Sequence, residues 1–298
     1  MIKFIILAFL LLMGHSSWAQ IRDFQTARLN SSAGAGVASI LCTEAALLNP
    51  ASCAFFSGSS LSYQSYSTSL RNESEERKNL NDDFSSKNRS QGFFVSDNDG
   101  PLKGGFAYLS QRENNYERNQ IAAHTAAPIG SNAAFGITYK YLTDKLPAEF
   151  NNRHRIQHFT ALGMSYIIDK DSTIGLVLND PTLTTSGEER LLAGFQYAVA
   201  SRLTLMADLG TQFTQDVKEK HLWRASAQLQ LFDDFFFRVG QFHDHIRGEK
   251  GHGWGASWIG PRLGIEFAQK ISDQFRRVGY LYKDEGLIDT SLSVVIKF

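Results

Sequence analysis

Apolar and polar residues alternate along most of the chain after about residue 60. Between 202 and 213, Leu203, Leu205, Ala207 and Leu209 occupy one set of alternate positions, and polar residues such as Asp208 interrupt them. Successive side chains of a β-strand point to opposite faces of a sheet, so a period of two residues predicts strands. One face of each predicted strand is apolar and the other is mostly polar. The alternation therefore predicts an all-β body over residues 59–298.

The turn residues between these alternating segments predict fourteen strands. Most are near the ~9–11 residues that a tilted strand needs to cross a bilayer, whereas sandwich strands are typically ~5–6 residues long. The longest predicted strand contains Pro261, which implies a bulge or break there. The predicted strands are 60–70, 89–97, 103–112, 117–127, 132–142, 155–168, 172–179, 189–200, 202–214, 221–232, 234–243, 253–270, 276–283 and 289–298.

Long and short connections fall at opposite ends of the predicted strands. Connections after odd-numbered strands are mostly long, as at 71–88 and 143–154, and those after even-numbered strands are short, as at 128–131 and 271–275. Outer-membrane barrels have short periplasmic turns and longer external loops, whereas a soluble sandwich has no reason for this asymmetry. We therefore predict a closed, antiparallel transmembrane β-barrel of about fourteen strands, in preference to a sandwich.

The amino terminus predicts export. Lys3 supplies a positive charge, an apolar run covers 4–13, and Ser17-Trp18-Ala19 fits a cleavage site, so we predict a signal peptide at 1–19. The run is too short for the alternative, a retained membrane anchor. Lys+Arg and Asp+Glu number 30 each, and this balance gives no electrostatic reason to expect a nucleic-acid partner.

Residues 20–58 differ from the rest of the chain because they are rich in small residues and do not alternate. We predict a compact segment whose short helix ends before Pro50. After export, Cys42 and Cys53 enter an oxidising compartment. A disulfide between them is favoured there over two buried thiols.

Two stretches of this segment carry a family resemblance. The run from Ala33 to Ala38, which contains Gly34 and Gly36, precedes Asn49-Pro50-Ala51. Together they resemble the amino-terminal hatch motif of the long-chain fatty-acid transporter family (FadL) and the related PorV-like barrels. We name residues 20–58 the hatch segment. The terminal aromatic Phe298 likewise resembles the closing signature of bacterial outer-membrane barrels.

The resemblance implies a barrel in the outer membrane of a Gram-negative bacterium. It would pass small hydrophobic or amphipathic, fatty-acid-like molecules past an amino-terminal plug. The implied partners are outer-membrane lipid, the barrel-assembly machinery that reads Phe298, and a hydrophobic ligand. A PorV-like role in secretion or assembly shares all of these sequence features.

Charged residues on the polar faces are expected inside the barrel, because charged side chains are costly in lipid. They either line a solute path or form an ion network that holds the hatch segment. The predicted lumen residues are Arg202, Asp208, Arg224, Arg238, Arg262 and Glu266.

Motifs for other chemistry are weak. The chain has no Gly-x-Ser-x-Gly, His-Glu-x-x-His or Walker sequence, so we expect no cofactor, and an outer-membrane enzyme is the less favoured alternative. His243, His245 and His252 lie in a predicted Gly-rich loop and are expected to be solvated rather than to bind metal. His154 and His158 are expected at the barrel rim.

Overall fold

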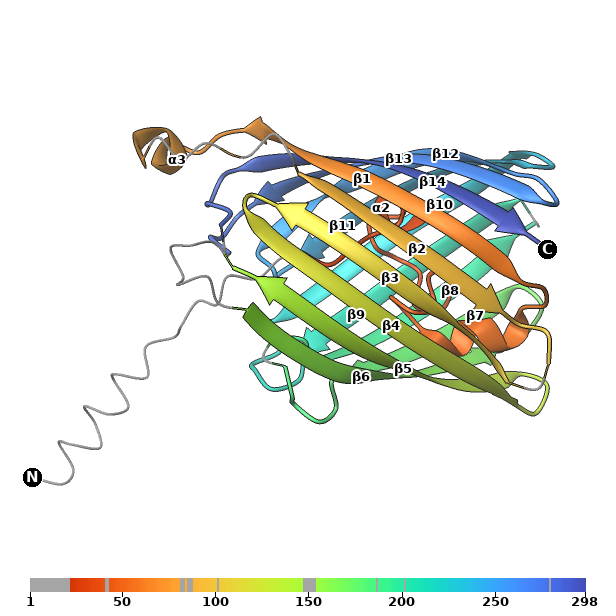
Figure 1. Cartoon of the computed structure of the whole chain (residues 1–298). Coiled ribbons are helices and arrows are strands. Elements are labelled where there is room, and N and C mark those ends of the chain that lie inside the picture. The colour runs from red at the N-terminus through yellow and green to blue at the C-terminus, as the bar shows by residue number, and fades with distance from the viewer. Residues whose placement is uncertain are drawn as a thin grey trace, which may run out of the picture.

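The computed structural model describes residues 22–40, 43–80, 84, 88–100, 102–146, 154–185, 187–200, 202–278 and 280–298. The predicted signal peptide lies outside these residues. Fourteen antiparallel strands form one closed barrel, which confirms the predicted fold class (Figure 1). The strands are β1 Ser60–Asn72, β2 Arg89–Asp97, β3 Lys103–Glu113, β4 Tyr116–Ile129, β5 Ala133–Lys145, β6 His154–Ile167, β7 Ser172–Asn179, β8 Arg190–Val199, β9 Leu203–Gln212, β10 His221–Phe232, β11 Phe235–Asp244, β12 Glu249–Ile259, β13 Leu263–Gln274 and β14 Gly286–Lys297.

The first and last strands close the barrel. β1 pairs with β14 from Ser60, opposite Lys297, to Leu70, opposite Leu287, and each other strand pairs with both sequence neighbours. A closed sheet leaves no strand edge with unpaired N–H and C=O groups, and only such a sheet is stable in lipid. Side chains then alternate between the two faces: on β9, Leu209 is 66% exposed and Asp208 is 1% exposed.

Two predicted strands near the carboxyl end were wrong. The predicted strand 253–270 is two strands, β12 and β13, joined by a turn at 260–262. Pro261 has no N–H to donate to a strand ladder, so it lies in the turn, where the Gly260 N–H donates to the Leu263 carbonyl at 2.9 Å. The two errors compensate, and the number of strands remains fourteen.

The predicted strand 276–283 belongs to the connection between β13 and β14. Its described residues form only a single bridge, between Val278 and Leu281. Tyr280 and Leu281 of this connection pack against Tyr116 and Leu287 in a buried cluster, so they do not face lipid. An alternating apolar pattern cannot separate these two environments.

The barrel has two unlike ends. Connections after even-numbered strands are short, from 98–102 to 260–262, and we call this the short-turn end. Connections after odd-numbered strands include 73–88, 180–189 and 275–285, and we call this the long-loop end. The predicted asymmetry is therefore present, although 271–274 completes β13 and is not a short turn. Two connections at the long-loop end are also short: the four residues 245–248 after β11 and the tight turn at 114–115. In the latter both asparagines have positive φ, as hairpin turns of this kind require.

The described residues of the hatch segment, 22–40 and 43–58, lie mainly inside the barrel (Figure 1). Its helix α2 (Ala27–Ser31) contacts β1 and β11–β14, and its 3-10 helix η1 (Pro50–Phe55) contacts β3–β6 on another part of the wall. The predicted helix before Pro50 is wrong, because residues 43–47 form turns and Pro50 instead begins η1, with Asn49 as its cap. Proline is favoured in the first helical turn, where no N–H bond is lost.

A further short helix, α3 (Glu75–Leu80), lies in the connection between β1 and β2. None of the helices in the described ranges is long and apolar enough to cross a membrane.

Candidate functional site

Glycines in the barrel wall let the backbone of the hatch segment lie directly against the strands. At several wall positions, an added Cβ would come closer to hatch-segment atoms than real Cβ atoms do. At these positions there is no room for a side chain, so the hatch segment packs tightly against two parts of the wall. These positions include Gly136 on β5, Gly163 on β6, Gly175 on β7, Gly240 on β11 and Gly253 on β12.

Asn49 joins the hatch segment to β6. Its side-chain nitrogen donates to the Val37 carbonyl at 2.8 Å and to Ser165 Oγ at 3.0 Å, and its oxygen accepts from the Ala51 N–H at 3.1 Å. The last bond caps η1, in which Pro50 is the first residue. The predicted motif Asn49-Pro50-Ala51 is therefore a buried structural joint between two parts of the hatch segment and the wall.

Four of the residues predicted separately meet at one place. The Asp208 carboxylate on β9 accepts from the backbone N–H of Gly36 at 2.8 Å and from that of Val37 at 3.2 Å. Arg224 on β10 donates to the Gly34 carbonyl at 3.0 Å. Gly34 and Gly36 both have positive φ, at 84° and 144°, which glycine adopts without steric cost. Two wall charges therefore hold the glycine-rich turn of the hatch segment.

A second ion cluster joins α2 to the wall. The Arg28 guanidinium lies 3.1 Å from Glu266 Oε1, and that of Arg238 lies 3.7 Å from the same oxygen. Arg238 Nε also donates to Gln228 Oε1 at 2.7 Å. Arg238 and Glu266 are almost fully buried, so pairing offsets the cost of removing these charges from water. Both residues lie on the inward face of their strands.

The remaining two predicted lumen residues lie at the short-turn end. Arg202 is exposed in the turn between β8 and β9. Its placement in the lumen was wrong, because β9 begins one residue later, at Leu203. Arg262 lies in the turn between β12 and β13 and lines a cavity at that end.

Charged residues that sequence reasoning missed occupy the long-loop half of the lumen. Arg22 of the hatch segment lies 2.7 Å from Asp289 Oδ1 on β14 and 3.3 Å from Glu113 Oε2 on β3. Tyr280 of the β13–β14 connection donates to the same Glu113 carboxylate. This network links the hatch segment, the wall and a long connection. The period-two pattern marks the inward position of Glu113, but nothing in it indicates Arg22 as the partner.

Further ion pairs surround the long-loop side of the hatch segment. Arg118 Nε on β4 lies 2.7 Å from Asp144 Oδ1 on β5, and Arg190 on β8 lies 3.2 Å from Asp23 of the hatch segment. A cavity of about 80 Å³ remains among these groups. The lumen on this side is therefore largely filled by paired charges.

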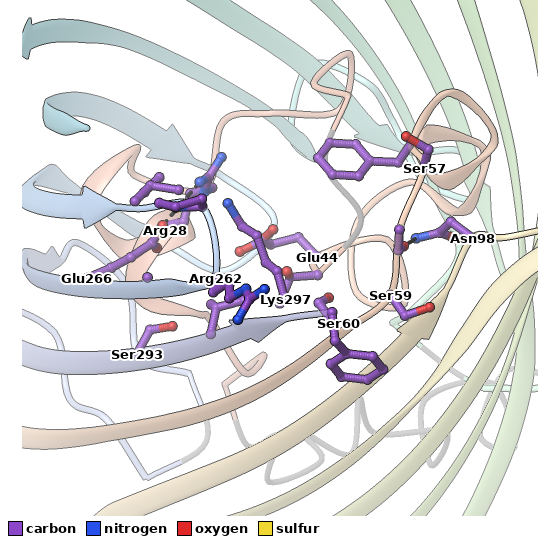
Figure 2. Close-up of a pocket in the computed structure, with 18 of the residues that line it drawn as sticks. Arg28, Glu44, Ser57, Ser59, Ser60, Asn98, Arg262, Glu266, Ser293 and Lys297 are labelled. Atoms are coloured by element: carbon purple, nitrogen blue, oxygen red, sulfur yellow. Dashed lines mark hydrogen bonds and ion pairs between the residues drawn. The ribbon is translucent and has the colours of Figure 1, made fainter. Parts of the chain in front are cut away.

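The short-turn end holds a much larger cavity, of about 710 Å³. Figure 2 shows charged side chains and serines around it, among them Arg28, Arg262 and Lys297. Apolar groups complete the lining: Phe56, Ile259, Pro261, Val295 and Phe298. A mixed lining of this kind suits a ligand with an apolar body and a polar or anionic group.

The cavity lies where the chain closes the barrel. Ser59 and Phe298 exchange two backbone hydrogen bonds, of 3.0 and 3.1 Å, beside the entry of the hatch segment into β1. Lys297 Nζ lies 3.3 Å from the Gly260 carbonyl. A smaller cavity of about 200 Å³ shares Arg28 with it and extends toward Gln196 and Met206.

The predicted disulfide cannot be followed, because Cys42 lies outside the described residues. Cys53 is buried in η1, and its Sγ lies 3.2 Å from His124 Nε2 on β4. In the described ranges, no three His, Cys, Asp or Glu side chains are grouped to hold a metal ion.

Comparisons of structure show what this fold resembles. The chain is similar to the CymD monoaromatic hydrocarbon channel, with a TM-score of 0.68, 10% identity, and coverage of 92% of this chain and 97% of that one. For the Ralstonia pickettii toluene transporter TbuX, the TM-score is 0.66, with 11% identity and coverage of 92% and 98%. For a Pseudomonas aeruginosa FadL homologue, these values are 0.62, 12%, 93% and 99%.

Compared as a sequence, the chain matches no family model and no curated protein. The structural likeness therefore shows that the chain has the fold of FadL-type barrels. The predicted resemblance is confirmed at the level of the fold.

Replacing Gly240 by alanine is expected to loosen the hatch segment, because the new Cβ would meet the backbone of Ser32 and Ala33. Overpacking of this kind costs about 1–3 kcal/mol. Urea unfolding of the barrel in lipid vesicles measures the change. Gly264→Ala is the matched control, because a Cβ there meets nothing nearer than 3.7 Å. Equal destabilisation by both variants would contradict the packing argument.

Asp208→Asn is expected to weaken the hold on the glycine-rich turn, because an amide has one acceptor oxygen where the carboxylate has two. Hydrogen bonds to a charged group contribute about 1.5–3 kcal/mol. Hydrogen exchange at the amides of Gly36 and Val37 should accelerate while exchange in the strands stays slow. Asp233→Asn, at an exposed position in a short turn, should leave both amides unchanged. Unaltered protection in Asp208→Asn would exclude the proposed anchor.

Proposed function

We propose that the chain is an outer-membrane transport protein that passes small hydrophobic or amphipathic molecules. The observation that carries this proposal is the cavity at the short-turn end, whose lining combines apolar and charged side chains. The charged ones are Arg262, Lys297, Glu44 and the ion pair of Arg28 with Glu266. The similar structures include a hydrocarbon channel and a toluene transporter. These structures support a hydrophobic solute only because they share the fold of this chain.

The outward face of the barrel supports placement in a membrane. Large apolar side chains such as Leu205, Leu209 and Phe237 are exposed there, while charged residues of the same strands are buried. This inverts the arrangement of a water-soluble protein, and lipid is the solvent that stabilises it. The long-loop end then faces the outside of the cell, as in other outer-membrane barrels.

The two halves of the lumen have different roles in this proposal. Ion pairs such as those of Arg22 and Arg190 fill the long-loop half. An uncharged solute that separated them would form no ion pair in their place. The large cavity receives the solute at the periplasmic side. Because wall glycines and Asp208 hold the hatch segment closely, transport proceeds by local rearrangement around it and does not require its release as a unit.

Uptake by proteoliposomes tests the proposal. Vesicles containing the full-length folded barrel are expected to take up labelled toluene and labelled oleate faster than protein-free vesicles and vesicles with an unrelated barrel. A heat-modifiable gel band establishes folding in each preparation. Uptake no faster than through the unrelated barrel would overturn the proposal. A protein that co-purifies with the barrel in stoichiometric amount would favour the PorV-like role instead.

Arg262 and Lys297 are expected to affect amphipathic anions but not purely apolar solutes. The double variant Arg262→Gln/Lys297→Gln is expected to reduce the affinity for oleate by about tenfold, because a charge-assisted contact contributes about 1.5–3 kcal/mol. Toluene uptake should stay unchanged, since toluene has no charge to pair. Arg202→Gln is the matched control because Arg202 is an exposed cation in another short turn. Equal losses for oleate and toluene would contradict an anion-binding role for this lining.

A further inference from the structure

Three histidines form a stack at the long-loop end, on β10, β11 and the turn after β11. The ring centroids of His221 and His245 are 4.2 Å apart, and those of His245 and His243 are 4.4 Å apart. Phe275 packs against the latter two rings, at 5.1 and 5.2 Å. We call His221, His243 and His245 the histidine stack. Stacked rings present their N–H groups along the edge of the stack instead of converging them on one point.

The histidine stack faces away from the lumen. His243 lies opposite Trp223 of β10 and Lys250 of β12 in the strand register. These residues belong to the half-buried or exposed set on their strands, whereas the intervening Phe242 and Asp244 are buried in the interior. The stack is therefore part of the outer surface of the barrel.

The level of the stack is set by the apolar residues below it. On β11 the outward side chains Phe235, Phe237 and Val239 are apolar, and the outward series then continues with Gln241 and His243. On β12 the same change occurs between Trp254 and the pair His252 and Lys250. The apolar band that lipid tails would cover ends just below the stack, so the stack lies at the level of lipid headgroups.

The β9–β10 connection, whose Val217 carbonyl lies 3.2 Å from His221 Nδ1, carries Asp216, Lys218 and Glu219, all exposed. The other charges around the stack are mainly cationic. Lys250 is exposed beside His243, and Arg276 donates to the backbone carbonyl of His245 at 3.0 Å. The carboxylate of Asp244 points inward and accepts from the Arg247 N–H at 2.9 Å. On β13, the outward Asp273 forms an ion pair with Arg71. The outer surface at the stack thus offers donors and positive charge.

Protonation would make this surface a stronger anion site. Burial, the neighbouring histidines and Arg276 lower the pKa of His245, which lies in the turn outside the strands, while Asp244 raises it. An anion placed against the ring would favour the protonated form, so binding and proton uptake support each other. The affinity for an anion is therefore expected to rise as the pH falls.

We propose that the histidine stack, together with Lys250, binds the phosphate of a lipid headgroup in the membrane leaflet at the long-loop end. A phosphate offers several acceptor oxygens to the row of imidazole N–H groups and to the lysine ammonium. Trp223 and Trp254 lie beside and below the stack, at the boundary where aromatic side chains commonly contact lipid. The proposal requires the barrel to lie in a membrane, and it is independent of what the barrel transports.

Lipid retention by the folded full-length barrel in neutral detergent tests this site. The probe is bisphosphorylated lipid A, and native mass spectrometry counts the molecules bound at pH 7.5 and pH 6. The double variant His243→Gln/His245→Gln is expected to retain lipid A about tenfold more weakly at pH 6. Wild-type protein should bind more tightly at pH 6 than at pH 7.5.

The matched control is His154→Gln/His158→Gln, because these two histidines are exposed at the outward face of β6 and are not part of the stack. It should retain lipid A like the wild type. Equal loss in both double variants, or unchanged retention in the stack variant, would overturn the proposal. Displacement of lipid A by millimolar inorganic phosphate would identify a site for free phosphate and would overturn the assignment to a lipid. Heat-modifiable gel mobility shows that each variant is folded.

Discussion

The backbone pairing of β1 with β14 is the constraint on which the rest of the structure depends. In lipid, an unpaired N–H or C=O group costs several kcal/mol, so the sheet must close. Closure gives every strand one outward and one inward face. The outward face can then be apolar, as Leu209 and Phe237 show, while the inward face gathers charged residues that need partners. The hatch segment supplies many of those partners.

The inward charged residues have different surroundings in the two halves of the lumen. Toward the long-loop end, Arg22 and Asp23 of the hatch segment pair with wall residues, and Tyr280 of a long connection joins the same network. Toward the short-turn end, Arg262 and Lys297 line a cavity of about 710 Å³. Buried ion pairs stabilise only when every member has a partner. In the half with the large cavity, Arg28 is paired with Glu266, whereas Arg262 and Lys297 lie beside open space.

Much of the fold could be predicted because strand period and turn residues are local signals. Most predicted strands match within a few residues, and the clearest error is the predicted strand 276–283. Val278, Tyr280 and Tyr282 alternate like the residues of a lipid-facing strand, yet Tyr280 and Tyr282 are buried within the β13–β14 connection. Pro261 marked the true boundary, because proline in a strand interior removes a ladder bond. A local sequence pattern indicates that a side chain has apolar surroundings. It does not show whether lipid or the protein interior provides them.

The sequence by itself determined the alternation, the two kinds of connection, the small-residue hatch segment and the inward position of Asp208, Arg224, Arg238 and Glu266. These properties follow from residue type at fixed spacing. Only the tertiary structure decided which groups meet: Asp208 with the Gly36 amide, Arg22 with Asp289, and Gly240 with Ser32. These partners are far apart along the chain, and barrel closure brings them together. A period of two residues specifies on which face of the sheet a side chain lies. Its partner inside the lumen is decided only when the barrel closes.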